Sequence, residues 1–240
     1  MKIKIFVMNS LLLLFAIGII SCNQNKIDEK ETIKIGVILP LTGPLSEYGI
    51  PLKNGMDLGL EQLNNTGGIK GKKLELLIED DKSTSKDAIN SANKLININK
   101  VKLILGPLSS GNSLAVAPLS EKSKVVQISL LAGIPELSQS GDFVFRIYPS
   151  SELGAKFAAE TAIEKFKPKK IAIMYANNPF GEASRRIYTE IIQKSNLLIS
   201  ATETFMDGDK DFKTQLTKIK ISNPDIILCS TYWGEGAIIL

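Results

Sequence analysis

Short apolar runs alternate along the chain with longer segments whose apolar residues recur at helical spacing. The first run, Ile33 to Leu39 (IKIGVIL), is rich in β-branched residues and predicts a strand. The apolar residues that follow lie three or four positions apart, which predicts a helix over residues 49–64. Further strands are predicted over 73–78, 102–105, 125–129, 143–146, 170–175, 198–202 and 225–229, and further helices over 85–98, 110–121, 151–166, 182–194 and 210–221. This order predicts an α/β protein with parallel sheets and right-handed crossovers.

Three features interrupt this rhythm. Gly67-Gly68 is expected to end the first helix, and Pro118 is expected to shorten or kink the helix over 110–121. Around Tyr148-Pro149-Ser150-Ser151 the alternation pauses. We therefore predict two lobes, an N-terminal one over residues 32–150 and a second one over residues 151–240.

The first 31 residues have a different character. Lys2 and Lys4 precede an almost wholly apolar run that ends just before Cys22, which is the pattern of a secretory signal peptide over residues 1–21. The small residue before Cys22 resembles a bacterial lipobox, so Cys22 is expected to become the lipidated first residue, followed by a polar tether to residue 31. An uncleaved membrane anchor is the alternative, although the run is shorter than the ~20 residues that a spanning helix needs.

Composition excludes several kinds of catalytic and metal site. The 240 residues are 44% hydrophobic and 22% charged, as in folded soluble proteins, and include no His and two Cys. Without His there can be no Ser-His-Asp triad, histidine base or HExxH zinc site, and two Cys cannot build a four-cysteine zinc site. No nucleophile–base pair, metal cluster or cofactor loop is visible, so we expect neither an enzyme nor a cofactor. If Cys22 carries lipid, Cys229 has no partner and is expected to be buried as an apolar residue.

The charge balance does not suggest nucleic acid. The formal net charge is +4, but Lys2 and Lys4 lie in the predicted signal peptide, and without them 27 basic residues face 25 acidic ones. A balance this close to neutral lacks the basic patch that binds phosphates.

The predicted carboxyl ends of the strands are where ligands bind in open α/β sheets. Most of these ends are rich in small, hydroxyl or aromatic residues, which suits a neutral or zwitterionic small molecule better than a nucleotide. The segment GGIKGK at residues 67–72 lacks the spacing of a phosphate loop, and no GxGxxG is present.

One strand end, Gly106 to Gly111 (GPLSSG), places hydroxyls at the start of a predicted helix. Free N–H groups and the helix dipole make this a natural site for a carboxylate. The alternative is that Ser109 or Ser110 merely caps the helix.

Two other groups also have two interpretations. Asp80-Asp81 could hold a cation, but capping the next helix or hydrogen bonding within its loop fits the spacing better. Tyr48, Phe180 and Tyr232 follow strand ends and could form an aromatic wall, whereas core packing is the usual role of a single aromatic residue.

Longer segments carry a resemblance over residues 32–240. They are, in chain order, IKIGVILPLTGPLSEYGIPLKNGMDLGLEQLNNTGGIKGKKLELLIEDD, GPLSSGNSLAVAP, FVFRIYPSS, KKIAIMYANNPFGE, DFKTQLTKIK and PDIILCSTYWGE. Their order and spacing resemble the leucine/isoleucine/valine-binding proteins, the type I periplasmic binding proteins of ABC importers.

The resemblance implies two Rossmann-like lobes with the ligand between them and a first hinge crossing near residues 150 and 151. It implies a small ligand, an amino acid or a related amide, that is delivered to a membrane permease by a protein exported and lipid-anchored to a bacterial membrane. A ligand-sensing receptor of the same fold is the alternative function. In the family the chain continues past Leu240, so this sequence is expected to be C-terminally incomplete.

The resemblance also assigns ligand-binding positions. Tyr48 matches an aromatic that covers the ligand, and Ser110 matches a serine that takes the ligand carboxylate. Phe180 and Tyr232 match aromatics of the second lobe. Leu131 and Gly133 match a loop whose backbone contributes N–H and C=O groups. Position 133 is usually Thr or Ser in the family, so Gly133 puts specificity for plain amino acids in doubt.

Overall fold

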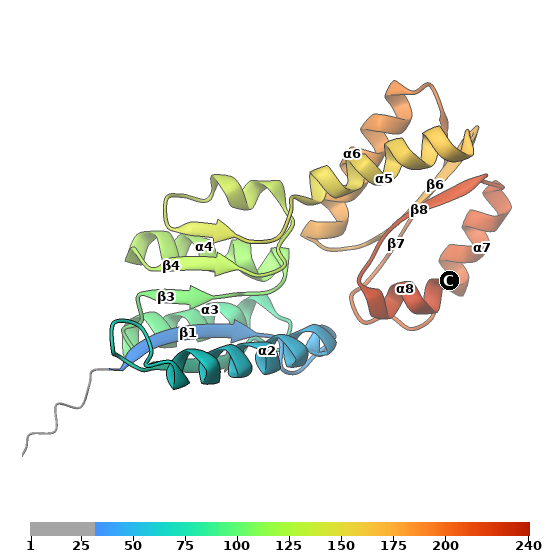
Figure 1. The fold of residues 1–240 in the computed structure, drawn as a ribbon. Helices are drawn as coiled ribbons and strands as arrows, with labels where there is room; N and C mark the ends of the chain where they lie inside the picture. Colours follow the sequence, from blue (N-terminus) through green and yellow to red (C-terminus); the bar gives the residue numbers. More distant parts are fainter. Residues whose placement is uncertain (1–31) are drawn as a thin grey trace, which may run out of the picture.

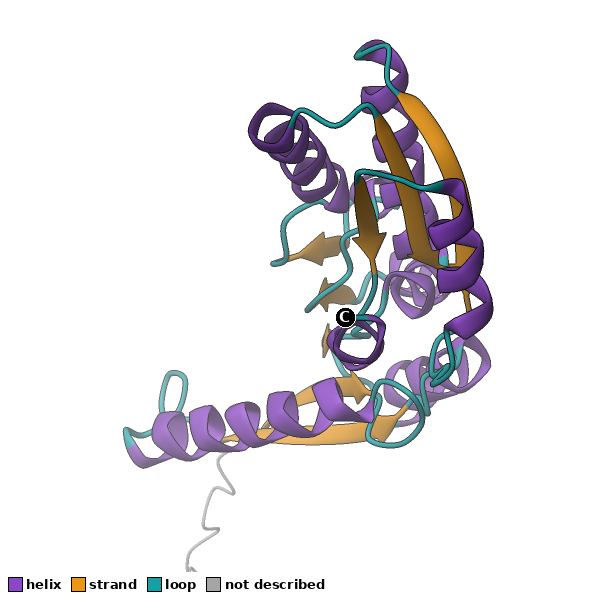
Figure 2. Ribbon diagram, turned by 90° about the vertical axis from the view of Figure 1, so that its right-hand side faces the viewer, coloured by secondary structure: helices purple, strands orange, loops and turns teal. Residues whose placement is uncertain are grey.

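The computed structural model describes residues 32–240 and builds them into two parallel sheets flanked by helices (Figures 1 and 2). The strands are β1 (Ile33–Leu39), β2 (Leu74–Asp80), β3 (Leu103–Leu105), β4 (Val126–Ser129), β5 (Val144–Arg146), β6 (Lys170–Ala176), β7 (Leu198–Phe205) and β8 (Ile226–Ser230). The helices are α2 (Ser46–Asn65), α3 (Ser85–Asn93), α4 (Ser110–Ser123), α5 (Ser151–Phe166), α6 (Pro179–Lys194), α7 (Lys213–Ser222) and α8 (Trp233–Ile239). The signal peptide, the tether and Cys22 lie outside the described residues.

The predicted strands and helices are confirmed, with ends that differ by at most three residues. The helix predicted over 85–98 is α3 followed by a π-helical turn, η1 (Lys94–Ile98), and a 3₁₀ turn that we did not predict, η2 (Pro135–Gln139), precedes β5. The expected shortening at Pro118 is wrong, because α4 runs on to Ser123. Pro118 removes one helical hydrogen bond, but burial of Val116 and Ala117 on the same helix outweighs that loss.

The two sheets have related topologies. The first has the order β2-β1-β3-β4-β5 and the second has the order β7-β6-β8, and every strand pair is parallel. In both, the earliest strand of the sheet is flanked by the two that follow it in the chain. The order therefore reverses at β1 and at β6, and such a reversal opens a crevice at the carboxyl ends of the strands.

Each sheet lies between two layers of helices. In the first lobe, Ile38 and Ile104 pack with α3 and α4, whereas Val37 and Leu39 pack on the opposite face with apolar residues of α2. In the second lobe, one face packs with α5 and α6, and the other packs with α7 and the end of α8. Strands that are covered on both faces need apolar residues at successive positions, which explains the continuous runs GVIL in β1 and IAIM in β6.

The lobes meet where their strands end. Figure 1 shows the first lobe in blue to green and the second in yellow to red, with α8 lying on the side of the second sheet that is nearer to α2. Ala183 of α6 packs into a cluster with Ala132 and Leu137 of the first lobe.

Within residues 32–240, no helix combines the length and the hydrophobicity needed to cross a membrane.

Candidate functional site

A cavity of about 880 Å³ lies between the two lobes, at the carboxyl ends of their strands. Its wall contains aromatic, aliphatic and hydroxyl side chains from both lobes. They are Tyr48, Pro51, Leu52, Leu108, Ser109, Ser110, Leu131, Tyr148, Phe180, Thr231, Tyr232, Trp233, Gly236, Ala237 and Leu240. Five of the six predicted ligand-binding residues are therefore brought to one cavity, and Gly133 is not part of its wall. The binding roles of these residues remain predictions.

The start of α4 supplies the polar part of the wall. Ser109 is the N-cap, and its hydroxyl oxygen accepts the backbone N–H of Asn112 at 3.2 Å. Capping is thus the role of Ser109, which leaves Ser110 free for another role. Ser110 is only 3% exposed, and its Oγ accepts the backbone N–H of Gly133 at 3.2 Å.

This arrangement suits an anion. Because Ser110 Oγ acts as an acceptor toward Gly133, its hydroxyl proton is not used in that bond. The first backbone N–H groups of α4 have no intrahelical acceptor, and the helix dipole places partial positive charge at the same point. A carboxylate in the cavity could accept hydrogen bonds from these groups.

Four aromatic side chains of the wall contact one another, and we call them the aromatic row. The rings of Tyr48 and Trp233 are stacked, with centroids 3.7 Å apart and an angle of 8° between planes. Tyr48 also contacts Tyr232 edge-on at 5.6 Å, and Tyr232 stacks with Phe180 at 5.7 Å. The row therefore crosses from the first lobe to the second, and the aromatic-wall interpretation of these residues is supported over separate core packing.

A hydrogen bond ties the same two elements together. The backbone N–H of Trp233 donates to Tyr48 Oη at 2.6 Å. Burial raises the pKa of Tyr48 to about 12; the hydrogen bond from Trp233 acts to lower it, and the charges of Glu47 and Glu235 add to the rise. The phenol is consequently neutral at physiological pH and can act as both donor and acceptor.

Sequence reasoning missed Trp233. It is the single tryptophan of the chain and directly follows Tyr232 at the end of β8. That position was a signal that could have identified it, because aromatic residues at strand ends were the criterion that selected its neighbour.

Gly133 lies behind the cavity wall. Its N–H is bonded to Ser110, and its carbonyl accepts the N–H of Ser151 at 2.7 Å and Arg146 Nη1 at 3.1 Å. A Cβ atom at this position would lie 3.1 Å from Ser151 Cβ and 3.2 Å from Ser151 N. Glycine here lets the start of α5 approach the loop closely, and the N–H and C=O groups of Gly133, predicted to contact ligand, have partners within the protein.

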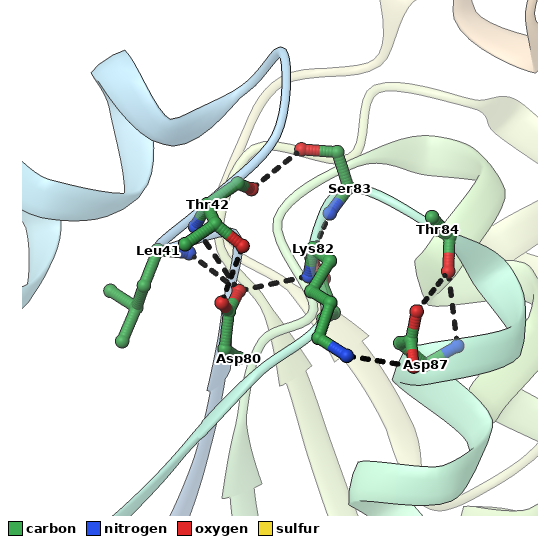
Figure 3. A network of polar contacts seen from close by, with 8 residues as sticks. Leu41, Thr42, Asp80, Lys82, Ser83, Thr84 and Asp87 are labelled. Carbon is green, nitrogen blue, oxygen red and sulfur yellow. Dashed lines mark hydrogen bonds and ion pairs between the residues drawn. The ribbon is translucent and has the colours of Figure 1, made fainter.

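The carboxylate of Asp80 is held by the loops around it (Figure 3). It accepts the backbone N–H groups of Leu41, Thr42 and Lys82 at 2.9, 3.2 and 2.8 Å, and the hydroxyl of Thr42 at 2.7 Å. Partial burial acts to raise the pKa of Asp80, but these hydrogen bonds outweigh it and leave the pKa below its usual value. Hydrogen bonding within the loops is confirmed.

Asp81 is fully buried and supports the start of α4. Its oxygens accept Ser83 N–H at 2.9 Å and Asn112 Nδ2 at 3.0 Å. Burial raises its pKa, chiefly by disfavouring the charged form. The next helix is capped by Thr84 and not by either aspartate.

Within residues 32–240 no group of three or more His, Cys, Asp or Glu side chains could hold a metal ion.

Two acids of the second lobe lie behind the aromatic row. Glu235 Oε1 accepts Gly208 N–H at 2.8 Å, and Asp207 Oδ1 accepts Asn178 Nδ2 at 2.6 Å. Burial raises the pKa of Asp207, and the nearby charge of Glu235 adds to the effect. Asn178 also caps α6, so this contact fixes the helix that carries Phe180.

Cys229 was expected to be buried as an apolar residue, and the structure makes it only partly buried. It is partly buried against the core of the second lobe, and burial raises its pKa to about 11. Thiolate is the reactive form, so this cysteine has little of it at neutral pH.

The sequence of this chain is similar to a known protein family over most of its length. A family model described as periplasmic binding protein matches residues 32–239. The Leu/Ile/Val-binding protein BraC3 of Rhizobium johnstonii is 29% identical over 208 residues, which are 86% of this chain and 56% of that protein. The Leu/Ile/Val-binding protein of Escherichia coli K12 is 30% identical over 211 residues, which are 88% of this chain and 57% of that protein. This chain thus spans a little over half the length of these relatives.

Solved structures agree in fold. The branched-chain amino acid transporter substrate-binding protein LivJ from Streptococcus pneumoniae, in complex with isoleucine, aligns with a TM-score of 0.80 at 30% identity and covers 87% of this chain and 60% of its own. A solute-binding protein of an ABC transporter from Rhodopseudomonas palustris BisB5, in complex with 3,4-dihydroxybenzoic acid, aligns with a TM-score of 0.75 at 25% identity and covers 85% and 56%.

Proposed function

This chain belongs to the periplasmic binding protein family, and from that premise we propose that it is the solute-binding component of an ABC importer. It would capture a small ligand between its two lobes and deliver it to a membrane permease. The observation that carries the proposal is the cavity of about 880 Å³ whose wall is built from the strand ends of both lobes. A ligand that contacts both walls binds the closed arrangement better than the open one, so binding and closure are coupled.

The ligand we propose carries a carboxylate and is an amino acid or a chemically related solute. The carboxylate would accept hydrogen bonds from the hydroxyl of Ser110 and from the first N–H groups of α4. Its apolar part would lie against Tyr48, Phe180 and Tyr232, with Leu131 closing the far side. The relatives named above bind leucine, isoleucine and valine or dihydroxybenzoate by their descriptions, and all of these ligands are small carboxylates.

Calorimetric titration with small carboxylates and with their matched primary amides tests this assignment. Removal of a hydrogen bond to a charged group costs about 1.5–3 kcal/mol, so Ser110→Ala should lower the affinity for a carboxylate roughly ten- to a hundredfold. The amide should lose less. Ser195→Ala, at the exposed C-terminal end of α6, is the control. Equal affinity of wild type and Ser110→Ala for every bound carboxylate would contradict the assignment.

We propose that the ligand leaves the protein chemically unchanged, because its role is transfer to a permease. Incubation of the protein with a bound ligand, followed by mass spectrometry, should recover the ligand intact. A new product that forms only with active protein would contradict this part of the proposal.

Family membership implies a location outside the cytoplasm, and we propose lipid attachment at Cys22 as the means of anchoring. The sequence pattern before Cys22 supports this proposal. Cells that express the protein and are fed a tagged fatty acid should label the wild type, whereas Cys22→Ala should remain unlabelled. Equal labelling of both would contradict lipidation at this residue.

A further inference from the structure

The edge of the first sheet that lies opposite the cavity carries a group of lysines. The strands of this sheet are parallel and run toward the second lobe (Figure 1), so they all begin at the same far edge. At that edge the backbone carbonyl of Lys73 accepts Ile33 N–H at 2.8 Å, and that of Lys102 accepts Val126 N–H at 3.1 Å. The helix ends and short segments that lead into these strands carry six exposed lysines, which we call the lysine face: Lys70, Lys73, Lys100, Lys102, Lys122 and Lys124.

The acidic residues near this edge do not neutralise the lysine face. Glu75 lies beside Lys34 in the register of β1 and β2, so these two charges offset each other. Glu121 accepts a backbone N–H of the loop before β5 at 2.9 Å. Glu61 and Asp142 also lie near this edge, but within residues 32–240 none of the six lysines forms an ion pair. A net positive charge therefore faces solvent.

Backbone conformation indicates that several of these lysines do not serve the local fold. Lys70, Lys100 and Lys124 have φ angles of 52°, 58° and 52°, in the left-handed region where glycine or asparagine is favoured. A lysine near a helix end also complements the helix dipole, but Lys122 in the last turn of α4 already does this before Lys124. These positions carry a charge where the backbone favours a residue without one, which points to a partner outside the fold.

The N-terminal segment joins the protein at the same edge. Residues 22–31 link the proposed lipid at Cys22 to the start of β1, and ten residues reach at most about 36 Å. Ile98 is 74% exposed and Ile69 is 45% exposed beside the lysines. Amines attract lipid phosphates, and exposed apolar side chains enter the headgroup region, so this combination suits an anionic bilayer.

We propose that the lysine face binds the surface of a bilayer that contains anionic phospholipids. Because the cavity lies at the opposite edge of the sheet, this contact turns the cavity away from the bilayer and toward the solute. A lysine close to an anionic surface strengthens binding roughly fivefold, and salt screens the attraction, so the contact is reversible and leaves the protein able to reach a permease. The proposal uses the proposed lipid anchor only to keep the protein near the bilayer, and it does not depend on which solute binds.

Lysine acetylation, followed residue by residue by mass spectrometry, tests the proposal. The full chain is reconstituted into vesicles of phosphatidylcholine alone or of phosphatidylcholine and phosphatidylglycerol in equal parts. The lysine face should be acetylated roughly threefold more slowly, or slower still, on the anionic vesicles, and high salt should remove this protection. Lys165 and Lys167, at the end of α5 in the second lobe, should react equally on both.

A pair of double variants gives a matched comparison. Lys122 and Lys124 occupy the last turn and the left-handed C-cap of α4, and Lys165 and Lys167 occupy the same positions of α5, where Lys167 has a φ of 46°. Lys122→Glu with Lys124→Glu should abolish the protection of the other four lysines on anionic vesicles. Lys165→Glu with Lys167→Glu should retain it, although the change of charge at the helix end is the same.

Equal acetylation of the wild-type lysine face on the two kinds of vesicle would overturn the proposal, and that comparison needs no variant. Equal protection of Lys165 and Lys167, or protection that survives Lys122→Glu with Lys124→Glu, would also overturn it. Calorimetry with a bound carboxylate should give the same affinity for this double variant as for the wild type, because the lysine face is outside the cavity wall. Failure of the membrane contact therefore leaves the proposed solute binding intact.

Discussion

Two clusters of side chains lie at the carboxyl ends of strands, a polar one within the first lobe and one of hydroxyl and aromatic groups between the lobes, and they differ in what their binding groups contact. In the Asp80-Asp81 cluster, the carboxylate oxygens accept N–H, amide and hydroxyl groups of the surrounding protein (Figure 3). At the cavity, Ser110 and the aromatic row line the wall, and within residues 32–240 the one hydrogen bond of Ser110 Oγ is the one it accepts from Gly133. The charged residues at this strand end are therefore bonded within the protein, whereas the groups that we propose to bind ligand line the cavity.

The two clusters are also physically connected. Asp81 holds the amide of Asn112, and Ser85 Oγ donates to the side-chain oxygen of the same residue at 3.0 Å. Asn112 lies two residues after Ser110 in the first turn of α4. The Asp80-Asp81 cluster thus supports the start of α4, which carries Ser110. Substitutions at Asp80 or Asp81 should therefore lower the stability of the fold, whereas substitution of Ser110 should lower ligand affinity.

The largest expected effect on stability is that of Asp81→Ala. The change leaves the buried amide of Asn112 and the N–H of Ser83 without their acceptor, which should cost about 3 kcal/mol in the free energy of unfolding. Urea unfolding followed by circular dichroism measures it. Asp57→Ala is the matched control, because Asp57 is half-exposed and pairs with Lys53 on the surface of α2. Similar losses in both variants would show that Asp81 is not a support.

A smaller loss, with a characteristic pH dependence, is expected for Asp80→Asn. An amide cannot accept hydrogen bonds on both of its terminal atoms, so the variant should lose about 1–2 kcal/mol at pH 7. The pKa of Asp80 is lowered below 3.8 in the folded state, so its stabilisation is present above that pH and is lost as the pH falls through the folded pKa.

Urea unfolding of wild type and Asp80→Asn across pH 7 to pH 3 checks this sign. The difference in stability between the two proteins should shrink as the pH falls below about 4. A difference that stays constant over this range would mean that the hydrogen bonds do not depend on the charge of Asp80.

The sequence predicted most of the fold because each strand and helix carries its own local pattern. Helix α6 shows where such patterns fall short. Its apolar periodicity begins near residue 182, but the helix begins at Pro179 with Asn178 as the N-cap. Asn before Pro is a start signal that periodicity alone does not use.

The site was predicted less completely because its contacts join distant parts of the chain. Tyr48 and Trp233 are 185 positions apart, and no local pattern indicates that their rings stack. Gly133 illustrates the same limit. The missing side chain was visible in the sequence, but the crowding by Ser151 that explains it depends on how α5 packs onto the loop.

The smallest of these effects is expected for Gly133→Ala. The added Cβ would meet Ser151 at 3.1 Å, so the start of α5 must shift by a few tenths of an ångström. We expect a loss of about 1 kcal/mol in unfolding free energy from overpacking. Gly154→Ala, which adds a Cβ in open space on α5, is the control and should be neutral or slightly stabilising. A Gly133→Ala variant as stable as this control would show that the loop accommodates the methyl group.

Hydrogen exchange of the backbone amides, with and without ligand, tests the central claim most directly. Isoleucine and 4-hydroxybenzoate are added separately at saturating concentration, and exchange is followed by mass spectrometry. We predict that whichever probe binds will slow exchange in residues 110–113 of the first lobe and in residues 231–236 of the second lobe together, while residues 80–84 remain unchanged. Slower exchange in only one lobe, or mainly in residues 80–84, would contradict a ligand site between the lobes.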